Sequence, residues 1–186
     1  MDKIICLVGE SGSGKSTIAE LLEEEGYNYI QSYTTRKPRF EGEKGHIFMG
    51  DSNIAYVDEL IPENELLSDV IAYTFFNGNH YWANKEQYQG KGVSIYVIDP
   101  AGVEYLREKI TDAEILVIYL RCDKATRFSR MLEERNVEDV VNRLKNDDKA
   151  FKVIKCDYVV GSDGEVQEVL ENIKSIIEKK VNKTNI

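Results

Sequence analysis

The sequence has no long hydrophobic run. A membrane-spanning helix needs about 20 consecutive apolar residues, and no stretch of the 186 residues approaches that length. The apolar run at residues 4–8 is followed directly by glycine, and it is shorter than the apolar region of a secretory signal peptide, which spans about 7–15 residues. These absences predict a cytoplasmic protein that has no membrane as its partner.

Cysteine is also scarce, and positive charge is in the minority. Three cysteines are widely spaced with no CxxC pair, so we expect reduced thiols in or near the core rather than disulfides or a structural metal site; they are Cys6, Cys122 and Cys156. The chain has 33 acidic and 24 basic residues, a net charge of −9. This balance argues against a nucleic-acid partner, which would favour a basic surface, but a local cluster of positive charge can still hold a small anion.

Hydrophobic patterning predicts one domain in which strands and helices alternate. Continuous apolar runs rich in β-branched residues indicate strands buried on both faces, at residues 3–8, 93–98 and 115–120, with shorter strands at 27–31 and 158–160. Apolar residues at helical spacing predict helices at residues 16–25, 102–110 and 165–180. Such alternation is typical of an α/β fold with a parallel sheet core flanked by helices.

Two segments interrupt this alternation. Residues 32–91 contain short aromatic-rich runs and turns, which indicate a small mixed α/β insertion. Residues 123–150 are highly charged and strongly helical, and they contain Arg127, Arg130, Arg135 and Arg143. The predicted core of this single domain therefore comprises residues 1–31, 92–122 and 151–186.

A phosphate-binding motif follows the first predicted strand. Residues 9–16, GESGSGKS, match G-x-x-x-x-G-K-[ST] in full and open a predicted helix, a context that argues against a chance glycine-rich turn. Glycines let backbone N–H groups surround a phosphate, and the helix N-terminus favours its charge. We expect Lys15 to reach the β- and γ-phosphates of ATP and the Ser16 hydroxyl to ligate Mg²⁺. The expected ATP-binding residues are Gly9, Glu10, Ser11, Gly12, Ser13, Gly14, Lys15, Ser16 and Thr17.

The motif does not define the second substrate, because GTPases, motors and small-molecule kinases share it. A GTPase would carry N-K-x-D, but residues 84–87 read NKEQ and lack the aspartate. The short chain and its glycine-rich loop instead favour a nucleotide kinase. Residues 32–40, SYTTRKPRF, place Arg36, Lys37 and Arg39 beside four hydroxyl groups. Two arginines three residues apart, next to a proline that fixes the backbone, can converge on one phosphate.

Over nearly its whole length the sequence resembles the guanylate kinase family. The resemblance rests on GESGSGKST at 9–17, SYTTRKPR at 32–39, NGNHYW at 77–82, VIDPAGV at 97–103 and ERNVEDVVNRL at 134–144. It implies the P-loop nucleoside-monophosphate-kinase fold, with a monophosphate-binding insertion at 32–91 and a helical lid at 123–150. It also implies transfer of a phosphoryl group from ATP, with Mg²⁺, to GMP or dGMP.

The resemblance assigns roles to particular residues. Arg36 and Arg39 bind the phosphate of the acceptor, and the acceptor site also contains Ser32, His46, Tyr81 and Asp99. Asp99 also approaches Mg²⁺, together with Ser16. Lid arginines close over ATP, so the expected catalytic residues are Lys15, Arg36, Arg39, Arg135 and Arg143.

Each assignment has a plainer alternative. His46 can be an exposed residue without a role, Tyr81 a packing residue and Asp99 a helix N-cap. We expect Arg127 and Arg130 to lie on a solvated helix face with i,i+4 ion pairs.

The residues for base recognition depart from the family. In guanylate kinases a glutamate six residues before the glycine of G-N-x-Y accepts hydrogen bonds from guanine, and this position is Ala72 here. The serine or threonine two residues after the tyrosine of the motif is Ala83, and the glycine between them is Trp82. Candidates for replacing these contacts are Asp69, Thr74 and Asn84, and Trp82 or Tyr73 could stack on a base. The alternative for each is core packing, which we expect for Tyr73.

Two other functions therefore stay open. One is a kinase of the same fold that acts on another acceptor, such as a different nucleotide or a phosphorylated sugar, and Ala72 and Ala83 motivate it. The other is a non-catalytic guanylate-kinase-like module that binds a protein partner. The intact Lys15 argues against that module, because such domains generally lose this lysine.

Overall fold

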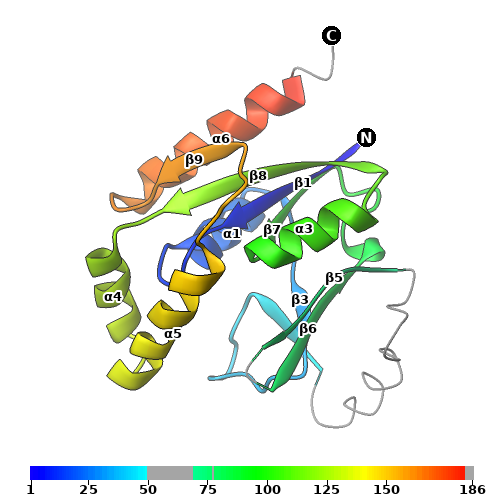
Figure 1. Cartoon of the computed structure of the whole chain (residues 1–186). Helices are drawn as coiled ribbons and strands as arrows, with labels where there is room; N and C mark the ends of the chain where they lie inside the picture. Colours follow the sequence, from blue (N-terminus) through cyan, green and yellow to red (C-terminus); the bar gives the residue numbers. More distant parts are fainter. Residues whose placement is uncertain (50–68, 77, 183–186) are drawn as a thin grey trace.

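A five-stranded parallel sheet forms the centre of the computed structural model, which describes residues 1–49, 69–76 and 78–182 (Figure 1). Its strands, in spatial order, are β2 (Asn28–Ile30), β7 (Val93–Val97), β1 (Asp2–Val8), β8 (Ala113–Arg121) and β9 (Tyr158–Gly161). All four neighbouring pairs are parallel. The predicted parallel core is therefore confirmed, because its continuous apolar runs do form the strands of one sheet.

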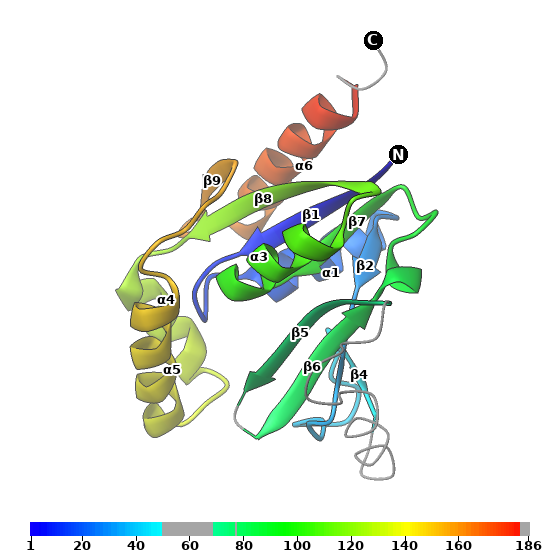
Figure 2. The same cartoon turned by 45° about the vertical axis from the view of Figure 1, so that its right-hand side comes forward.

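Helices cover both faces of this sheet. Along β1, Ile5 and Leu7 belong to a buried cluster with α1 (Lys15–Glu24) and α6 (Val166–Asn182), whereas alternate residues belong to a second cluster with α3 (Pro100–Lys109). Figure 2 shows α3 on one side of the sheet and α6 on the other. Burial of both faces of a strand explains why β1 has no polar alternation.

A second, mixed sheet lies beneath α3 in both views. Its spatial order is β4 (His46–Phe48), β3 (Ser32–Thr34), β6 (Asn79–Asn84) and β5 (Val70–Phe76), and the short 3₁₀ helix η2 (Lys85–Gln87) follows it. The pair β3–β4 is parallel, while β6 runs antiparallel to β3 and β5. This sheet lies within the predicted insertion, of which residues 50–68 and 77 are outside the described part.

Two helices lie beyond the carboxyl ends of β1 and β8 (Figure 1). They are α4 (Lys124–Leu132) and α5 (Val137–Ala150), and the side chains of Asp123 and Asn136 cap their N-termini. Met131, Val140 and Leu144 form a small core between them. These helices fill most of the predicted lid, but the division of the chain into core, insertion and lid stays a prediction.

The cysteines lie in or near the core. All three cysteines are free; Cys6 and Cys122 are buried and Cys156 is half-buried. Burial raises the pKa of the Cys6 thiol to about 12, so this thiol is an unreactive core group. Within the described ranges, no helix combines the length and apolar character needed to span a bilayer.

Candidate active site

The loop between β1 and α1 has the geometry of a phosphate cradle. Gly12 and Gly14 have φ values of +80° and +89°, which L-residues with a side chain rarely adopt. A Cβ at Gly9 would lie 2.7 Å from the Leu120 carbonyl oxygen, and one at Gly12 would lie 2.7 Å from the Arg127 carbonyl oxygen. The glycines are therefore required both by the turn and by the close approach of neighbouring backbone.

Lys15 folds back over this loop. Its Nζ donates to the Glu10 carbonyl oxygen at 2.9 Å and to Ser13 Oγ at 3.3 Å. Burial lowers the pKa of Lys15 to about 8, and the carboxylates of Asp147 and Glu10 partly oppose this effect. The ammonium group is thus poorly hydrated, a condition in which a bound anion interacts with it strongly.

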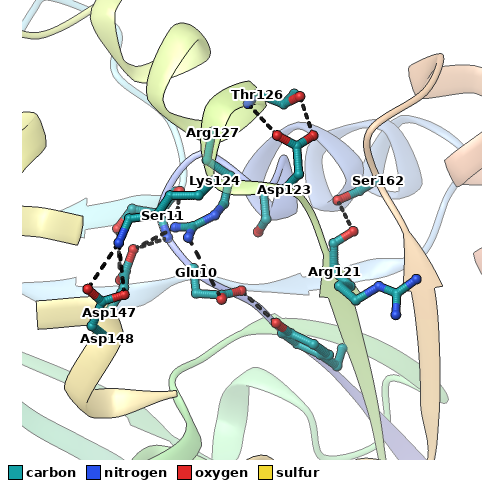
Figure 3. Close-up of polar contacts among 12 residues, drawn as sticks. Glu10, Ser11, Arg121, Asp123, Lys124, Thr126, Arg127, Asp147, Asp148 and Ser162 are labelled. Carbon is teal, nitrogen blue, oxygen red and sulfur yellow. Dashed lines mark hydrogen bonds and ion pairs between the residues drawn. The ribbon is translucent and has the colours of Figure 1, made fainter. Parts of the chain in front are cut away.

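The cradle is attached to the predicted lid by a buried ion-pair network (Figure 3). Asp147 on α5 accepts hydrogen bonds from Ser11 N at 2.9 Å, from Ser11 Oγ at 3.2 Å and from Arg127 Nη1 at 3.1 Å. Arg127 also donates to the Ser11 carbonyl oxygen at 3.3 Å and lies 3.9 Å from Glu10 Oε1. Tyr119 completes the network by donating to Glu10 Oε2 at 2.7 Å.

This network corrects the expectation that Arg127 and Arg130 are solvated. Only 4% of Arg127 is exposed, and Arg130 Nη1 donates to the Gly12 carbonyl oxygen at 3.4 Å. Both arginines thus donate hydrogen bonds to carbonyl groups of the cradle. The charge pattern along α4 does not reveal these contacts. Asp147 was missed although it carries a signal: it continues the buried stripe of Val140 and Leu144 at helical spacing.

Arg36 and Arg39 converge on one carboxylate, as the resemblance predicts they do on a phosphate. Arg36 Nη1 and Nη2 lie 3.1 and 2.9 Å from the two oxygens of Glu43. Arg39 donates to the same carboxylate through its backbone N at 2.6 Å and through Nε at 2.8 Å. The Glu43 side chain is only 4% exposed. We call Arg36, Arg39 and Glu43 the arginine cluster.

The two threonines before the arginine cluster have structural roles. The Arg36 backbone N donates to Thr34 Oγ1 at 3.1 Å, and His80 N donates to Thr35 Oγ1 at 3.0 Å. The Arg36 guanidinium lies over the Phe48 ring, 5.1 Å from its centroid, where a cation is attracted to the aromatic face. Strand β4 therefore contacts the guanidinium of Arg36, and strand β6 holds the preceding residue, Thr35.

The ion pairs of Glu43 in the arginine cluster make the free energy of unfolding decrease at acidic pH. Burial alone would raise the pKa of Glu43, but hydrogen bonds from Arg36 and Arg39 outweigh it and lower this pKa from 4.5 to about 2. Because the folded pKa is the lower one, the carboxylate stabilises the fold fully above pH 4.5, and this contribution is lost as the pH falls toward 2. The expected loss is about 2 to 3 kcal/mol.

Urea unfolding between pH 3 and 7 measures this effect. The free energy of unfolding should fall more steeply below pH 4.5 in the wild type than in Glu43→Gln. The exposed Glu41 provides the matched control, and Glu41→Gln should follow the wild type. Parallel curves for the wild type and Glu43→Gln would contradict the pKa of Glu43.

A cleft of about 460 Å³ runs from the cradle to the second sheet and α5. Eight predicted site residues line it, namely Gly9, Ser11, Lys15, Ser32, His46, Tyr81, Asp99 and Arg143. A neighbouring cavity of about 480 Å³ shares Ser32 and His46 with the cleft and adds Ser16, Thr17, Arg39 and Arg135. Arg36 lines neither of these two spaces; its guanidinium contacts Phe48 and Glu43, and Glu43 lines the second cavity. The fold thus gathers the predicted residues around two adjoining spaces.

Asp99 and Ser16 differ in their freedom to ligate a metal ion. Ser16 is exposed in the first turn of α1. Asp99 caps α3 through Oδ1, which accepts from Gly102 N at 2.7 Å, so the N-cap alternative describes one of its oxygens. Oδ2 has a longer contact of 3.4 Å with Thr74 Oγ1. A hydroxyl and a carboxylate oxygen beside a phosphate cradle are suitable ligands for Mg²⁺.

His46 and Tyr81 lie side by side with their ring centroids 5.5 Å apart. His46 is half-buried, and burial together with the nearby Arg36 charge lowers its pKa. Its Nδ1 is buried and has no hydrogen-bond partner in the part of the chain that the structure describes. His46 therefore does not fit the alternative of an exposed residue, although its role as a phosphate ligand stays a prediction.

The candidates for base recognition separate into two groups. Ala72, Tyr73 and Thr74 line the cleft, and the Tyr73 hydroxyl is hydrogen-bonded to His80 Nδ1 at 2.9 Å. Trp82 does not line it, because the residue is only 7% exposed and its ring stacks on Tyr33 with centroids 5.5 Å apart. Asn84 caps η2, and Ala83 is fully buried. Of the predicted substitutes, only Tyr73 and Thr74 can contact a ligand in this cleft.

Both arginines of the predicted lid, Arg135 and Arg143, contact one carboxylate. Asp139 Oδ2 lies 3.1 Å from Arg143 Nε and 3.5 Å from Arg135 Nε. All three residues lie in or just before α5, where spacings of four residues place them on one face. Asp139 therefore holds Arg143 at the cleft and Arg135 at the neighbouring cavity.

A P-loop between the first strand and first helix of a parallel sheet, with helices on both faces, defines a P-loop kinase-like domain. Residues 5–151 match the family model described as "AAA domain", and the chain belongs to this family. A guanylate kinase from Anaplasma phagocytophilum has a similar structure, with a TM-score of 0.65 over 96% of this chain and 86% of that chain at 18% identity. This similarity confirms the predicted α/β fold.

Curated relatives carry a different name. The dephospho-CoA kinase of Staphylococcus aureus (strain Mu50) is 25% identical over 201 residues, which cover 97% of this chain and 94% of the relative. The dephospho-CoA kinase of Staphylococcus haemolyticus is also 25% identical, over 97% of this chain and 96% of the relative. Structure and sequence comparisons thus agree on a P-loop kinase fold and differ in the acceptor that their names contain.

Proposed function

We propose that this protein transfers a phosphoryl group from ATP to the phosphate of a nucleoside monophosphate, with GMP or dGMP as the preferred acceptor. The convergence of Arg36 and Arg39 on a single carboxylate carries this proposal. Guanidinium groups recognise carboxylates and phosphates through the same paired N–H donors. The two arginines, of which Arg39 lines the cavity that also contains Ser16 and Thr17 of the P-loop, support an acceptor that presents an anionic group.

In this proposal the chain positions charge and supplies no nucleophile. An oxygen of the acceptor phosphate attacks the γ-phosphorus, the bond to the β,γ-bridging oxygen breaks, and ADP leaves. Phosphoryl transfer of this kind depends on in-line placement and on positive charge around the transferred group. Lys15 supplies this charge from the cradle, and Arg135 and Arg143 supply it from the lid. Arg36 and Arg39 hold the acceptor.

Ser16 and Asp99 are the proposed ligands of Mg²⁺, with Asp99 acting directly or through water. When bound, Mg²⁺ neutralises charge on the phosphates. Glu10, Ser11, Gly12, Ser13 and Thr17, together with the other cradle residues, are the proposed ATP-binding set. Ser32, His46, Tyr81 and Asp99 complete the acceptor side.

A second candidate acceptor is dephospho-CoA, the substrate that the names of the curated relatives contain. Ala72 supports an acceptor other than guanine nucleotides, because it lines the cleft without a polar group where guanylate kinases have a glutamate. A missing hydrogen-bond partner for a buried polar group costs about 1 to 3 kcal/mol. An acceptor other than a guanine nucleotide is therefore the main rival, whether it is another monophosphate or dephospho-CoA, whose acceptor group is a ribose hydroxyl.

A coupled ADP-release assay with ATP and Mg²⁺ tests the proposal. The acceptors are GMP, dGMP, AMP, CMP, UMP, dTMP and dephospho-CoA, each measured against ATP hydrolysis without acceptor. We expect GMP or dGMP to give a kcat/KM at least about 10-fold above the others, since a hydrogen bond that a wrong acceptor cannot make is worth at least that factor. Preference for another monophosphate, or for dephospho-CoA with its ribose hydroxyl as the attacking group, would replace the acceptor assignment. Tight ATP binding without any acceptor-dependent turnover would favour the non-catalytic module.

A further inference from the structure

The Glu43 carboxylate contacts both Arg36 and Arg39, and each of its two oxygens accepts hydrogen bonds from both arginines. The carboxylate binds Arg36 through both terminal nitrogens and Arg39 through Nε and the backbone N. All of these contacts lie within the stretch from residue 36 to 43. Such short, charge-assisted hydrogen bonds fix the orientation of a guanidinium as well as its position.

From this geometry we infer that Glu43 is a positioning residue, which holds Arg36 and Arg39 in the arrangement that receives the phosphate of the acceptor. The inference rests on the proposed function and adds to it the residue that orders the acceptor site before substrate arrives. No sequence signal distinguishes Glu43 from Glu41, the other glutamate of its charged loop.

The arginine cluster keeps the capacity to bind an anion. Two guanidinium groups and one carboxylate leave one net positive charge. A guanidinium has five N–H donors, and Glu43 uses only the Nε and Nη2 side of Arg39. The Arg39 side chain is 48% exposed and lines the cavity that also contains Ser16. The Nη1 donors of Arg39 therefore remain for a phosphate.

The opposite interpretation is that Glu43 occupies the place of the phosphate and must leave before an acceptor binds. Its burial argues against that interpretation, because the side chain is only 4% exposed and its carboxylate is fully hydrogen-bonded where it is. Arginine side chains lose much rotamer freedom when they are fixed. If Glu43 fixes them in the free protein, acceptor binding does not have to supply this entropic cost, which is the usual benefit of preorganisation.

Steady-state kinetics of Glu43→Gln tests the inference. This variant keeps the shape of the side chain and removes its charge, and Glu41→Gln makes the same change at an exposed position of the same loop. We expect kcat/KM for the acceptor to fall about 10- to 100-fold in Glu43→Gln, as expected for misplaced binding groups. The KM for ATP should change less than about 2-fold, and Glu41→Gln should resemble the wild type.

Three results would overturn the inference. A lower acceptor KM in Glu43→Gln would mean that the carboxylate competes with the phosphate. Unchanged kinetics would mean that the arginines need no positioning. Equal loss of acceptor and ATP affinity with a lower melting temperature would indicate a purely structural role.

A binding measurement separates this inference from the proposed function. With ADP and Mg²⁺ saturating the cradle, calorimetric titration with inorganic phosphate reports on the arginine cluster and requires no turnover. Weaker phosphate binding by Glu43→Gln than by Glu41→Gln supports the inference even if no acceptor in the panel is phosphorylated. Equal or tighter binding contradicts it.

Discussion

Replacing Lys15 by alanine is expected to lower the turnover number about 10²- to 10³-fold, the effect of removing one preorganised group that stabilises developing charge. The Lys15 ammonium group is held inside the cradle by Glu10 and Ser13, and burial has removed much of its hydration. Its charge therefore acts on a phosphate through a medium of low polarity. A coupled ADP-release assay with the best acceptor measures the decrease.

Lys179→Ala is the matched control, since Lys179 is exposed on α6. It should retain full turnover. Circular dichroism and the melting temperature should be similar for both variants. A lower turnover number then reflects the loss of a catalytic group and not a loss of folding. A Lys15→Ala enzyme within about 3-fold of the wild type would remove Lys15 from the proposed set of catalytic residues.

Replacing Arg127 by methionine is expected to destabilise the fold by about 3 to 5 kcal/mol, because it leaves a buried carboxylate without its cation. Asp147 is only 8% exposed, and burial already raises its pKa. Methionine keeps most of the volume of the arginine, so the loss of charge dominates. For a chain of this length, a destabilisation of that size lowers the melting temperature by about 6 to 20 °C.

A double substitution identifies the cause. If the unpaired carboxylate is responsible, Arg127→Met with Asp147→Asn should recover part of the stability, since the amide carries no charge. Arg121→Met, at an exposed position where β8 ends, should leave the melting temperature within about 2 °C of the wild type. The expectation fails if Arg127→Met has the melting temperature of the control. It also fails if Asp147→Asn destabilises the Arg127→Met variant as much as it destabilises the wild type.

The sequence was informative where one physical signal dominates. Strands β1, β7 and β8 are buried on both faces, so their continuous apolar runs could be recognised without any knowledge of their partners. The P-loop was equally clear, because the spacing of its glycines, Lys15 and Ser16 is a local pattern in the sequence. These features depend on residues that are close together in the chain.

The missed residues depend on partners far away in the chain. The sequence predicts Arg127 to be solvated, because the charge pattern along α4 does not show that the Ser11 carbonyl group lies against this side chain. Trp82 was a candidate for stacking on a base because its contact with Tyr33 arises only when β3 pairs with β6. Glu43 is different, because its partners Arg36 and Arg39 are close in the chain, but an irregular loop has no periodicity from which their contact could be predicted.

Ala72 constrains how this cleft can acquire a new acceptor. It lines the cleft, yet it is only 4% exposed and packs in the same buried cluster as Ile4 and Cys6 of the central strand. A glutamate introduced there would bring a charge into the shared core, where an unpaired carboxylate is strongly unfavourable. Thr74, two residues along the same strand, is half-buried and already contacts Asp99. Substitutions at position 74 are therefore an easier route to a changed acceptor preference than substitutions at position 72. A substitution at position 72 would disturb the buried cluster around β1.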